Sequence, residues 1–314
     1  MTVAFVFPGQ GSQDVGMGKA LADAFPVAKA VFDEVDEALG EKLSAIMWAG
    51  TKDEITLTEN AQPALMAVSV AAARVLEQEH GVAPTAAAFA AGHSLGEYSA
   101  LAATGALGVA DAARLLRLRG QSMQKAVPVG TGAMIALLGA GLDAAQAIAK
   151  AAAHDDVLDV ANDNEPTQVV LSGHKVAADR VPALAKEHGV RRAVPLPVSA
   201  PFHCSLMQPA ADAMAAALAR ATVKAPAIPI VANVTAEPTS DPAKIVDNLV
   251  AQVTGTVHWR ECVLAMQAAG VDRYIELGSG KVLAGLVRRT DKDAKAASIG
   301  GPDDFAAALE LING

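Results

Sequence analysis

The strongest chemical signal in the sequence is the pentapeptide Gly92-His93-Ser94-Leu95-Gly96. A serine in this Gly-x-Ser-x-Gly spacing is typical of a nucleophile held on a sharp turn between a strand and a helix. Such a turn exposes the hydroxyl and points nearby N–H groups at the oxygen that becomes negative during acyl transfer. An apolar run at 86–91 predicts the strand, and a helix is expected over 95–103. The alternative is a turn that only requires small residues; the flanking elements favour the nucleophile.

A serine nucleophile needs a general base, and the sequence offers seven histidines. Four lie in polar or helix-end surroundings that are typical of solvated residues: His80, His154, His174 and His188. His258 precedes a tryptophan and is expected to pack or to lie in a loop, and His93 is expected to support the turn with a hydrogen bond. His203 remains, in a proline-containing loop where a parallel α/β sheet places functional residues. Taken alone, a base and an ordinary loop histidine are equally good interpretations.

Arg119 is conspicuous because of its position on a predicted helix over 111–126. On a helical wheel the polar residues gather on one side, and Arg119 falls in the middle of the apolar side. An isolated buried charge costs several kcal/mol, so the guanidinium needs either a structural carboxylate or the anion of a ligand. The wheel leaves both interpretations open.

These residues lie in a chain whose predicted strands and helices alternate. The run at 3–7 predicts a buried strand that ends at Pro8-Gly9 in a glycine-rich loop. Helices are expected soon after Gly18, over 64–78 and over 111–126. Asp111 is expected to cap the last of these helices. Later strands are expected at 228–234 and 273–278. Alternating strands and helices predict an α/β fold with a mostly parallel central sheet.

After Pro128 the pattern changes to shorter elements. Strands are predicted at 132–139, 168–173 and 191–198, with helices at 142–153 and 177–188 between them. A β-α-β-α-β order of this kind indicates a small sheet of ferredoxin-like type inserted into the larger unit.

Composition excludes several functional classes. The chain has 314 residues, enough for one large domain or two coupled ones, and 52% of them are hydrophobic but only 4% aromatic, which predicts an aliphatic core. Acidic residues outnumber basic ones 34 to 25, and the net charge of -9 argues against nucleic-acid binding. The two isolated cysteines, Cys204 and Cys262, argue against a disulfide framework or a cysteine-based zinc site.

Membrane insertion is also not expected. No stretch approaches the roughly 18 consecutive apolar residues of a membrane span, and the N-terminal segment lacks the basic residues of a signal peptide. A cytoplasmic location is therefore expected.

Five motifs occur in a characteristic order: FPGQGSQ at 7–13, GHSLGEYSA at 92–100, the RG pair at 119–120, PxxxPFHCSLM at 197–207 and ELGSGKVLAGL at 276–286. With them the chain resembles malonyl-CoA:acyl-carrier-protein transacylases of bacterial type II fatty acid synthesis, from residue 2 to about residue 290. The resemblance implies an α/β-hydrolase-like large subdomain, formed by 1–127 and 199–314, and a ferredoxin-like small subdomain over 128–198 inserted in it.

The resemblance also implies roles for single residues. Ser94 would be the nucleophile and His203 the base, as a Ser-His dyad without the acidic member of a full triad. A backbone carbonyl at the position of Gln252 would orient the histidine.

The same resemblance assigns the surroundings of the acyl group. Gln10 and the Leu95 N–H would form the oxyanion hole, and Arg119 would pair with the free carboxylate of the malonyl group. Met123 and Phe202 would line the acyl pocket. Leu95 and Phe202 are the types found in malonyl-selective members, and a ring beside the α-carbon would disfavour methylmalonyl, although one methyl group is worth only about 1–3 kcal/mol.

The implied activity is that of a malonyl-CoA:acyl carrier protein malonyltransferase. The malonyl group would pass from malonyl-CoA to Ser94, and then to the phosphopantetheine thiol of acyl carrier protein, in a ping-pong reaction. No metal, nucleotide or redox cofactor is needed. The product, malonyl-acyl carrier protein, feeds fatty acid chain elongation.

Two other functional classes are compatible with parts of the sequence. A serine hydrolase or thioesterase would use the same serine turn, but the sequence lacks an obvious acidic triad member between Ser94 and His203. A non-catalytic subunit that binds acyl carrier protein would not be acylated at Ser94. Because acyl carrier proteins are acidic, docking needs a local basic patch, and the candidates are Lys186 with Arg191-Arg192, and Arg288-Arg289.

Overall fold

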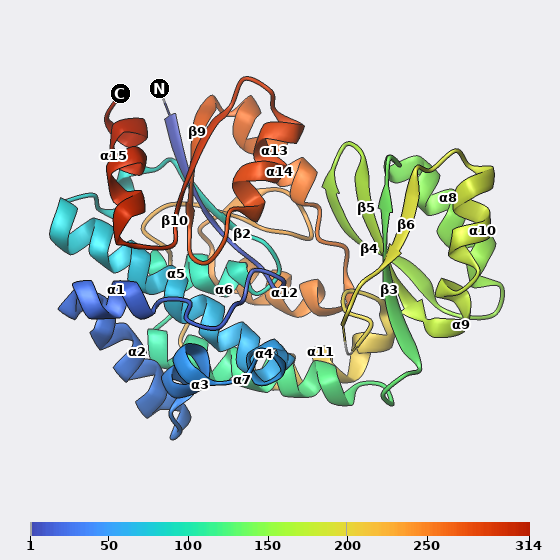
Figure 1. The fold of residues 1–314 in the computed structure, drawn as a ribbon, viewed down its shortest axis with the longest axis horizontal. Coiled ribbons are helices and arrows are strands. Elements are labelled where there is room, and N and C mark those ends of the chain that lie inside the picture. Colours follow the sequence, from blue (N-terminus) through green and yellow to red (C-terminus); the bar gives the residue numbers. More distant parts are fainter. Residues whose placement is uncertain (1, 199) are drawn as a thin grey trace.

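A mostly parallel sheet of six strands forms the centre of the larger part of the computed structural model, which describes residues 2–198 and 200–314 (Figure 1). The strands follow the order β10 (Lys295–Ile299), β9 (Val271–Leu277), β1 (Thr2–Phe7), β2 (Phe89–Gly92), β7 (Ile230–Val231) and β8 (Pro238–Thr239). Neighbouring strands are parallel except β7 and β8, which are antiparallel. The predicted α/β fold with a mostly parallel sheet is confirmed.

The sheet is buried on both faces, as the alternation in β1 illustrates. Val3, Phe5 and Phe7 belong to the apolar cluster on one face, whereas Ala4 and Val6 belong to the cluster on the other. Because successive side chains of a strand point to opposite faces, an uninterrupted apolar run is the pattern of a strand covered twice.

Helices supply both clusters. The first cluster draws on α1 (Lys19–Ala24), α2 (Pro26–Leu39), α3 (Leu43–Ala49), α4 (Lys52–Thr56), α5 (Thr58–His80), α6 (Gly96–Ala103), α7 (Val109–Lys125), α11 (Gln208–Leu218), α12 (Pro242–Thr254) and α15 (Phe305–Asn313). The second draws on α13 (Trp259–Ala268) and α14 (Val282–Thr290). No helix in the described part of the chain has the length and apolar character needed to cross a membrane.

A second sheet of four antiparallel strands lies beside the first unit (Figure 1). Its order is β4 (Leu158–Glu165), β5 (Gln168–His174), β3 (Gly132–Leu138) and β6 (Arg192–Pro195). One face is covered by α8 (Leu142–Ala153), α9 (Lys175–Ala178) and α10 (Val181–Glu187). From the other face, Met134 and Ala136 of β3 join the core of the large unit. The ferredoxin-like and hydrolase-like assignments, and the boundaries at 127/128 and 198/199, stay predictions; Met1 and Ser199 lie outside the described residues.

Three local predictions are wrong. The predicted β-α-β-α-β order omits strand β4, because the polar residues of this strand hide the strand pattern. The helix predicted over 177–188 is instead two short helices, α9 and α10, and Pro182 stands in the first turn of the second. Gly108, not Asp111, is the N-cap residue of α7; Asp111 lies in its first turn and forms an ion pair with Arg114.

Strand β4 joins the small sheet to the large unit. Val257 receives a hydrogen bond from the Asp163 N–H at 3.0 Å and donates one to the Ala161 carbonyl at 2.8 Å. The buried Asp163 carboxylate forms an ion pair with Arg260 at 2.8 Å, and Glu165 pairs with Arg289 at 2.8 Å. These backbone and charged contacts fix the position of the small sheet against α13 and α14.

Replacing Arg260 by methionine tests the strength of this junction. The Asp163 side chain is only 1% exposed, so the variant leaves a buried carboxylate without its cation, and the free energy of unfolding is expected to fall by about 3 kcal/mol. Lys175→Met, which breaks the exposed pair with Asp179, is the matched control and is expected to change it by less than about 1 kcal/mol. Urea titration measures both; equal small effects would contradict the proposed role of the junction.

Candidate active site

The Gly-x-Ser-x-Gly segment forms a sharp turn between β2 and α6. Ser94 has a positive φ of 55°, a conformation that costs free energy for a residue with a side chain. The turn is possible because its flanking glycines are in close contact: a Cβ on Gly92 would lie 1.9 Å from backbone atoms of Gly96, and one on Gly96 would lie 2.2 Å from the Phe7 carbonyl oxygen. The predicted strand, turn and helix are therefore all present.

Gly92→Ala is expected to disrupt this turn. Backbone atoms of Gly96 stand where the added methyl group must go, so we expect a loss of about 3 kcal/mol in the free energy of unfolding. Gly108→Ala is the control, since Gly108 has a φ of -66° and its nearest neighbour to a Cβ lies at 3.8 Å. That change is expected to alter stability by less than about 1 kcal/mol. Chemical denaturation compares the two, and equal stability would contradict the steric account.

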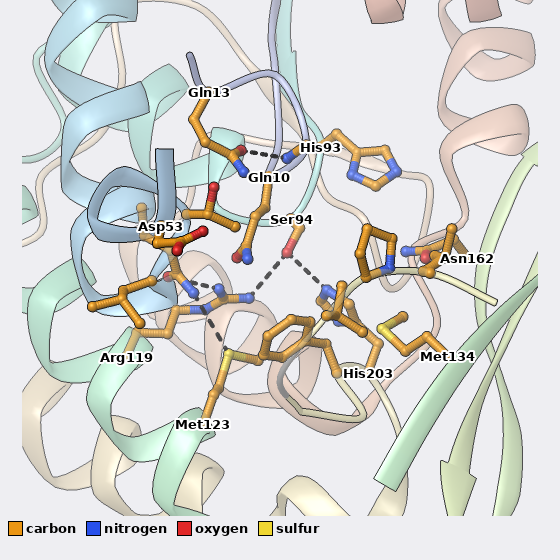
Figure 2. Close-up of a pocket in the computed structure, with 18 of the residues that line it drawn as sticks. Gln10, Gln13, Asp53, His93, Ser94, Arg119, Met123, Met134, Asn162 and His203 are labelled. Carbon is orange, nitrogen blue, oxygen red and sulfur yellow. Dashed lines mark hydrogen bonds between the residues drawn. The ribbon is translucent and has the colours of Figure 1, made fainter. Parts of the chain in front are cut away.

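The Ser94 hydroxyl lies between two side chains, as Figure 2 shows. Its Oγ is 2.7 Å from Nε2 of His203, and Nη2 of Arg119 donates to it at 3.2 Å. Nδ1 of His203 lies 2.8 Å from the Gln252 carbonyl oxygen, which can only accept. Nδ1 therefore carries the hydrogen, and Nε2 is free to take the proton of Ser94.

Burial controls the protonation of this histidine. His203 is almost entirely buried, and desolvation, assisted by the positive charge of Arg119, lowers its pKa to about 3. The imidazole is therefore neutral at physiological pH and ready to accept a proton. The other histidine of the turn, His93, points away: its Nε2 lies 2.8 Å from Oδ1 of Asn164, in the supporting role expected from the sequence.

Arg119 is 1% exposed and is held by neutral amide oxygens. Its Nη1 donates to Oε1 of Gln62 at 2.9 Å, and its Nη2 donates to Oε1 of Gln252 at 2.8 Å. Within the described ranges no Asp or Glu oxygen comes within ion-pair distance of it. Burial lowers its pKa, which shows how poorly its charge is solvated. Of the two interpretations of this buried charge, the geometry favours pairing with the anion of a ligand.

A cavity of about 750 Å³ opens onto these groups. Its walls come from both parts of the fold: Met134, Leu196 and Val198 lie on the small-sheet side, and Met123 on α7 and Phe202 belong to the large unit. The remaining lining includes Gln10, Gln13, Lys52, Asp53, Gln62, Asn162 and the three residues Ser94, Arg119 and His203. A volume of this size is within the range of pockets that bind small molecules.

The predicted oxyanion residues lie beside the serine. Gly9 packs so closely on the turn that a Cβ there would be 2.7 Å from the His93 carbonyl oxygen, and this contact brings Gln10 to the cavity. The Gln10 side chain donates to Thr58 at 3.3 Å. Leu95 is the N-cap residue of α6, so its N–H points out of the helix terminus, where an anion is favoured.

Sequence reasoning missed three buried polar residues that hold the site together: Gln62, Glu97 and Asn233. Asn233 follows β7 at the edge where parallel strands end, and its Oδ1 accepts from the Ser94 N–H at 2.7 Å. On α5, Gln62 directly precedes the apolar run at 63–68, and Glu97 lies in α6, every residue of which is buried. A polar residue in an apolar helix face is the signal that reveals both.

The chain is similar to known proteins over almost its whole length. Residues 4–305 match the acyl transferase domain family. The malonyl CoA-acyl carrier protein transacylase of Escherichia coli (strain K12) is 48% identical over 311 residues, which cover 98% of this chain and 99% of that protein. The protein of the same name from Bacillus subtilis (strain 168) is 43% identical over 313 residues, covering 99% and 97%.

Solved structures are similar over the same length. An acyl-carrier-protein S-malonyltransferase from Bartonella henselae has a TM-score of 0.97 and 51% identity, with complete coverage of both chains. A malonyl transacylase solved in complex with its type II polyketide synthase acyl carrier protein has a TM-score of 0.95 and 41% identity, covering 99% of each chain.

Proposed function

The chain belongs to the acyl transferase family and, within it, to the malonyl CoA-acyl carrier protein transacylases, and from this premise we propose how its residues carry out the reaction. The enzyme transfers the malonyl group of malonyl-CoA to the phosphopantetheine thiol of acyl carrier protein. The observation that supports this reaction best is the buried Arg119, which lies 3.2 Å from the Ser94 hydroxyl and forms no ion pair with any Asp or Glu among the residues that the structure describes. An acyl group that carries a free carboxylate supplies the missing partner.

Acylation starts from the neutral His203. Its Nε2 takes the proton of the Ser94 hydroxyl, and Oγ attacks the thioester carbonyl carbon of malonyl-CoA. The Gln10 side chain and the Leu95 N–H stabilise the oxyanion that forms. When the carbon–sulfur bond breaks, His203 returns its proton to the sulfur and coenzyme A leaves as a thiol. A malonyl-Ser94 ester remains.

The second half reverses these steps with another thiol. Nε2 of His203 deprotonates the phosphopantetheine thiol of acyl carrier protein, and the sulfur attacks the ester carbonyl of malonyl-Ser94. The carbon–oxygen bond breaks, Oγ regains the proton from His203, and malonyl-acyl carrier protein leaves. The Gln252 carbonyl holds Nδ1–H throughout, in the place where a hydrolase triad has a carboxylate.

The malonyl carboxylate is also expected to change the pKa of His203 when it binds to Arg119. While Arg119 is unpaired, its charge contributes to the low pKa of His203. A carboxylate that pairs with the guanidinium neutralises this charge, so the pKa of His203 rises and the imidazole becomes a stronger base in the substrate complex. Acyl groups without a carboxylate do not provide this effect. Phe202 and Met123 line the cavity, and the Phe202 ring would disfavour a substituent on the α-carbon of the acyl group.

A transfer assay tests this function against the hydrolase alternative. The enzyme is incubated with malonyl-CoA, with and without phosphopantetheinylated acyl carrier protein, and both malonyl-acyl carrier protein and free malonate are measured over time. We expect rapid transfer and slow hydrolysis. Hydrolysis at the rate of transfer would favour a thioesterase, and no reaction with either acceptor would favour a non-catalytic binding subunit.

The docking site for acyl carrier protein is proposed from exposed basic residues. Arg191 and Arg192 are exposed, whereas Arg289 is bound to Glu165 and Arg288 donates to the Ala296 carbonyl. The first pair, with Lys186, is therefore the better candidate for contact with an acidic partner.

Charge reversal at this pair tests the proposal. Arg191→Glu together with Arg192→Glu is expected to raise the KM for acyl carrier protein about tenfold, because attraction to the acidic partner becomes repulsion. The KM for malonyl-CoA serves as the internal control and should stay the same. Steady-state kinetics over a range of salt concentrations measures both, and an unchanged KM for the carrier would place the docking site elsewhere.

The cytoplasmic location and the subdomain boundaries also belong to this proposal. The family acts in bacterial type II fatty acid synthesis, and this supports a cytoplasmic enzyme. The segment 128–198 contains every strand of the antiparallel sheet, which supports its description as the inserted small subdomain.

A further inference from the structure

Glu97 is a buried carboxylate that the mechanism above does not use. It lies three residues after the nucleophile, is 3% exposed, and forms no ion pair with any residue that the structure describes. Its Oε2 accepts hydrogen bonds from Nε2 of Gln252 at 2.6 Å and from the Asn233 N–H at 3.2 Å. Burying a carboxylate without a cation costs free energy, which indicates that Glu97 has a role in the site.

Gln252 is the residue through which Glu97 reaches the reacting groups. Its carbonyl oxygen accepts from Nδ1 of His203, and its side-chain Oε1 accepts from Arg119 at 2.8 Å. Its Nε2 also donates to the Ser94 carbonyl oxygen at 3.0 Å. One residue thus contacts the base, the carboxylate-binding arginine and the backbone of the nucleophile.

The amide of Gln252 has only one favourable orientation in this network. Its Nε2 faces oxygens of Glu97, Ser94 and Asn233, and its Oε1 faces the guanidinium of Arg119. A carboxylate is the strongest of these acceptors, because hydrogen bonds to an ionised group are shorter and stronger than neutral ones. Loss of this acceptor loosens the side chain whose other end holds Arg119.

We propose that Glu97 is a positioning residue of malonyl transfer, which acts through Gln252 to keep the His203 imidazole and the Arg119 guanidinium in place beside the Ser94 hydroxyl. The inference rests on the proposed function and deepens it. Glu97 itself contacts neither the substrate nor the reacting oxygen. It fixes Gln252, which in turn holds His203 and Arg119.

The charge of Glu97 gives this role a distinctive pH dependence. Burial raises the pKa of Glu97 to about 7. The hydrogen bonds from Gln252 and Asn233 and the positive charge of Arg119 on α7 lower this pKa, but their effects are smaller. The other titratable groups that sense it are Tyr98 on α6 and Cys262 on α13, and burial raises the pKa of each. His203, with a pKa of about 3, stays neutral in the free enzyme over the same range. Since the ionised carboxylate is the stronger acceptor, kcat/KM should fall as the pH drops through about 7.

Three variants test the proposal. Glu97→Leu removes the acceptor, and Glu97→Gln keeps an acceptor oxygen without the charge. Glu276→Gln is the matched control, because Glu276 is another fully buried carboxylate, on β9, that accepts from the N–H groups of Leu283 and Ala284. For each we measure malonyl transfer from pH 5 to 9, thermal unfolding, and the rate at which a fluorophosphonate labels Ser94, which requires no malonyl group.

We expect Glu97→Leu to reduce both kcat/KM for malonyl transfer and the rate of Ser94 labelling by about 10- to 100-fold. Glu97→Gln should recover most of that loss and should lack the fall in activity near pH 7. Glu276→Gln should keep the wild-type pH profile. If the leucine variant does not fold, the pH profile of Glu97→Gln tests the positioning role of Glu97 on its own.

Two results would overturn the inference. One is a Glu97→Gln profile that still falls near pH 7, and the other is a folded Glu97→Leu enzyme that labels and transfers at the wild-type rate. Either would leave the proposed function intact, provided that the wild-type enzyme transfers malonyl. A wild-type enzyme that transfers none, yet is labelled at Ser94, would instead refute the function.

Discussion

Alanine at position 94 is expected to reduce malonyl transfer by at least about 10⁴-fold, because the variant has no oxygen to form the acyl-enzyme. His203→Ala should cause a loss of similar order, and the double variant should be little worse than either single one, since the two residues act as a unit. The 2.7 Å contact between Oγ and Nε2 is the basis of this non-additivity.

Steady-state transfer to acyl carrier protein measures these effects. Ser99→Ala is the matched control, because Ser99 is a fully buried serine of α6, the helix that follows the Ser94 turn, and its hydroxyl has no partner among the described residues. That variant should transfer malonyl within a few-fold of the wild-type rate. Additive losses in the double variant, or substantial transfer by Ser94→Ala, would contradict a Ser-His dyad.

Arg119→Ala is expected to change the choice of substrate as well as the rate. The variant leaves the malonyl carboxylate buried without a cation, and kcat/KM for malonyl-CoA should fall by about 10²- to 10³-fold. Acetyl-CoA has no carboxylate and should react at least as fast as with the wild-type enzyme. Arg119→Lys keeps the charge but loses the planar fork that Gln62 and Gln252 hold, so it should recover only part of the loss.

The ratio of kcat/KM for malonyl-CoA to that for acetyl-CoA is the decisive quantity, since it cancels any general loss of active protein. Fluorophosphonate labelling of Ser94 should persist in Arg119→Ala, which shows that the dyad is intact. An unchanged ratio would mean that Arg119 is a structural residue and that the carboxylate is bound elsewhere.

The parts of the site that are local in sequence could be predicted from it. The turn around Ser94 needs Gly92 and Gly96 within five residues, and the apolar face that buries Arg119 is visible on one helix. Each of these features is determined by residues close to one another in the chain. His203 could be selected among seven histidines, but only the fold shows its Nε2 at the serine.

The features that depend on distant residues were missed. Strand β4 has the polar sequence LDVANDNE, because Asp163 and Glu165 pair with Arg260 and Arg289 about a hundred residues away. Glu97 is likewise buried by contacts with Gln252, which lies on α12. In both cases a charge that would be exposed in an isolated strand or helix is stabilised by tertiary contacts, and the local pattern does not show which distant residues make those contacts.

The most direct test of the account is the intact mass of the protein after brief exposure to malonyl-CoA, followed by peptide mapping. We expect one malonyl group per chain, located on Ser94, absent from Ser94→Ala, formed more slowly from methylmalonyl-CoA, and removed when phosphopantetheinylated acyl carrier protein is added. A protein that transfers malonyl without ever carrying it, or that carries it on another residue, would contradict the proposed malonyl-serine intermediate.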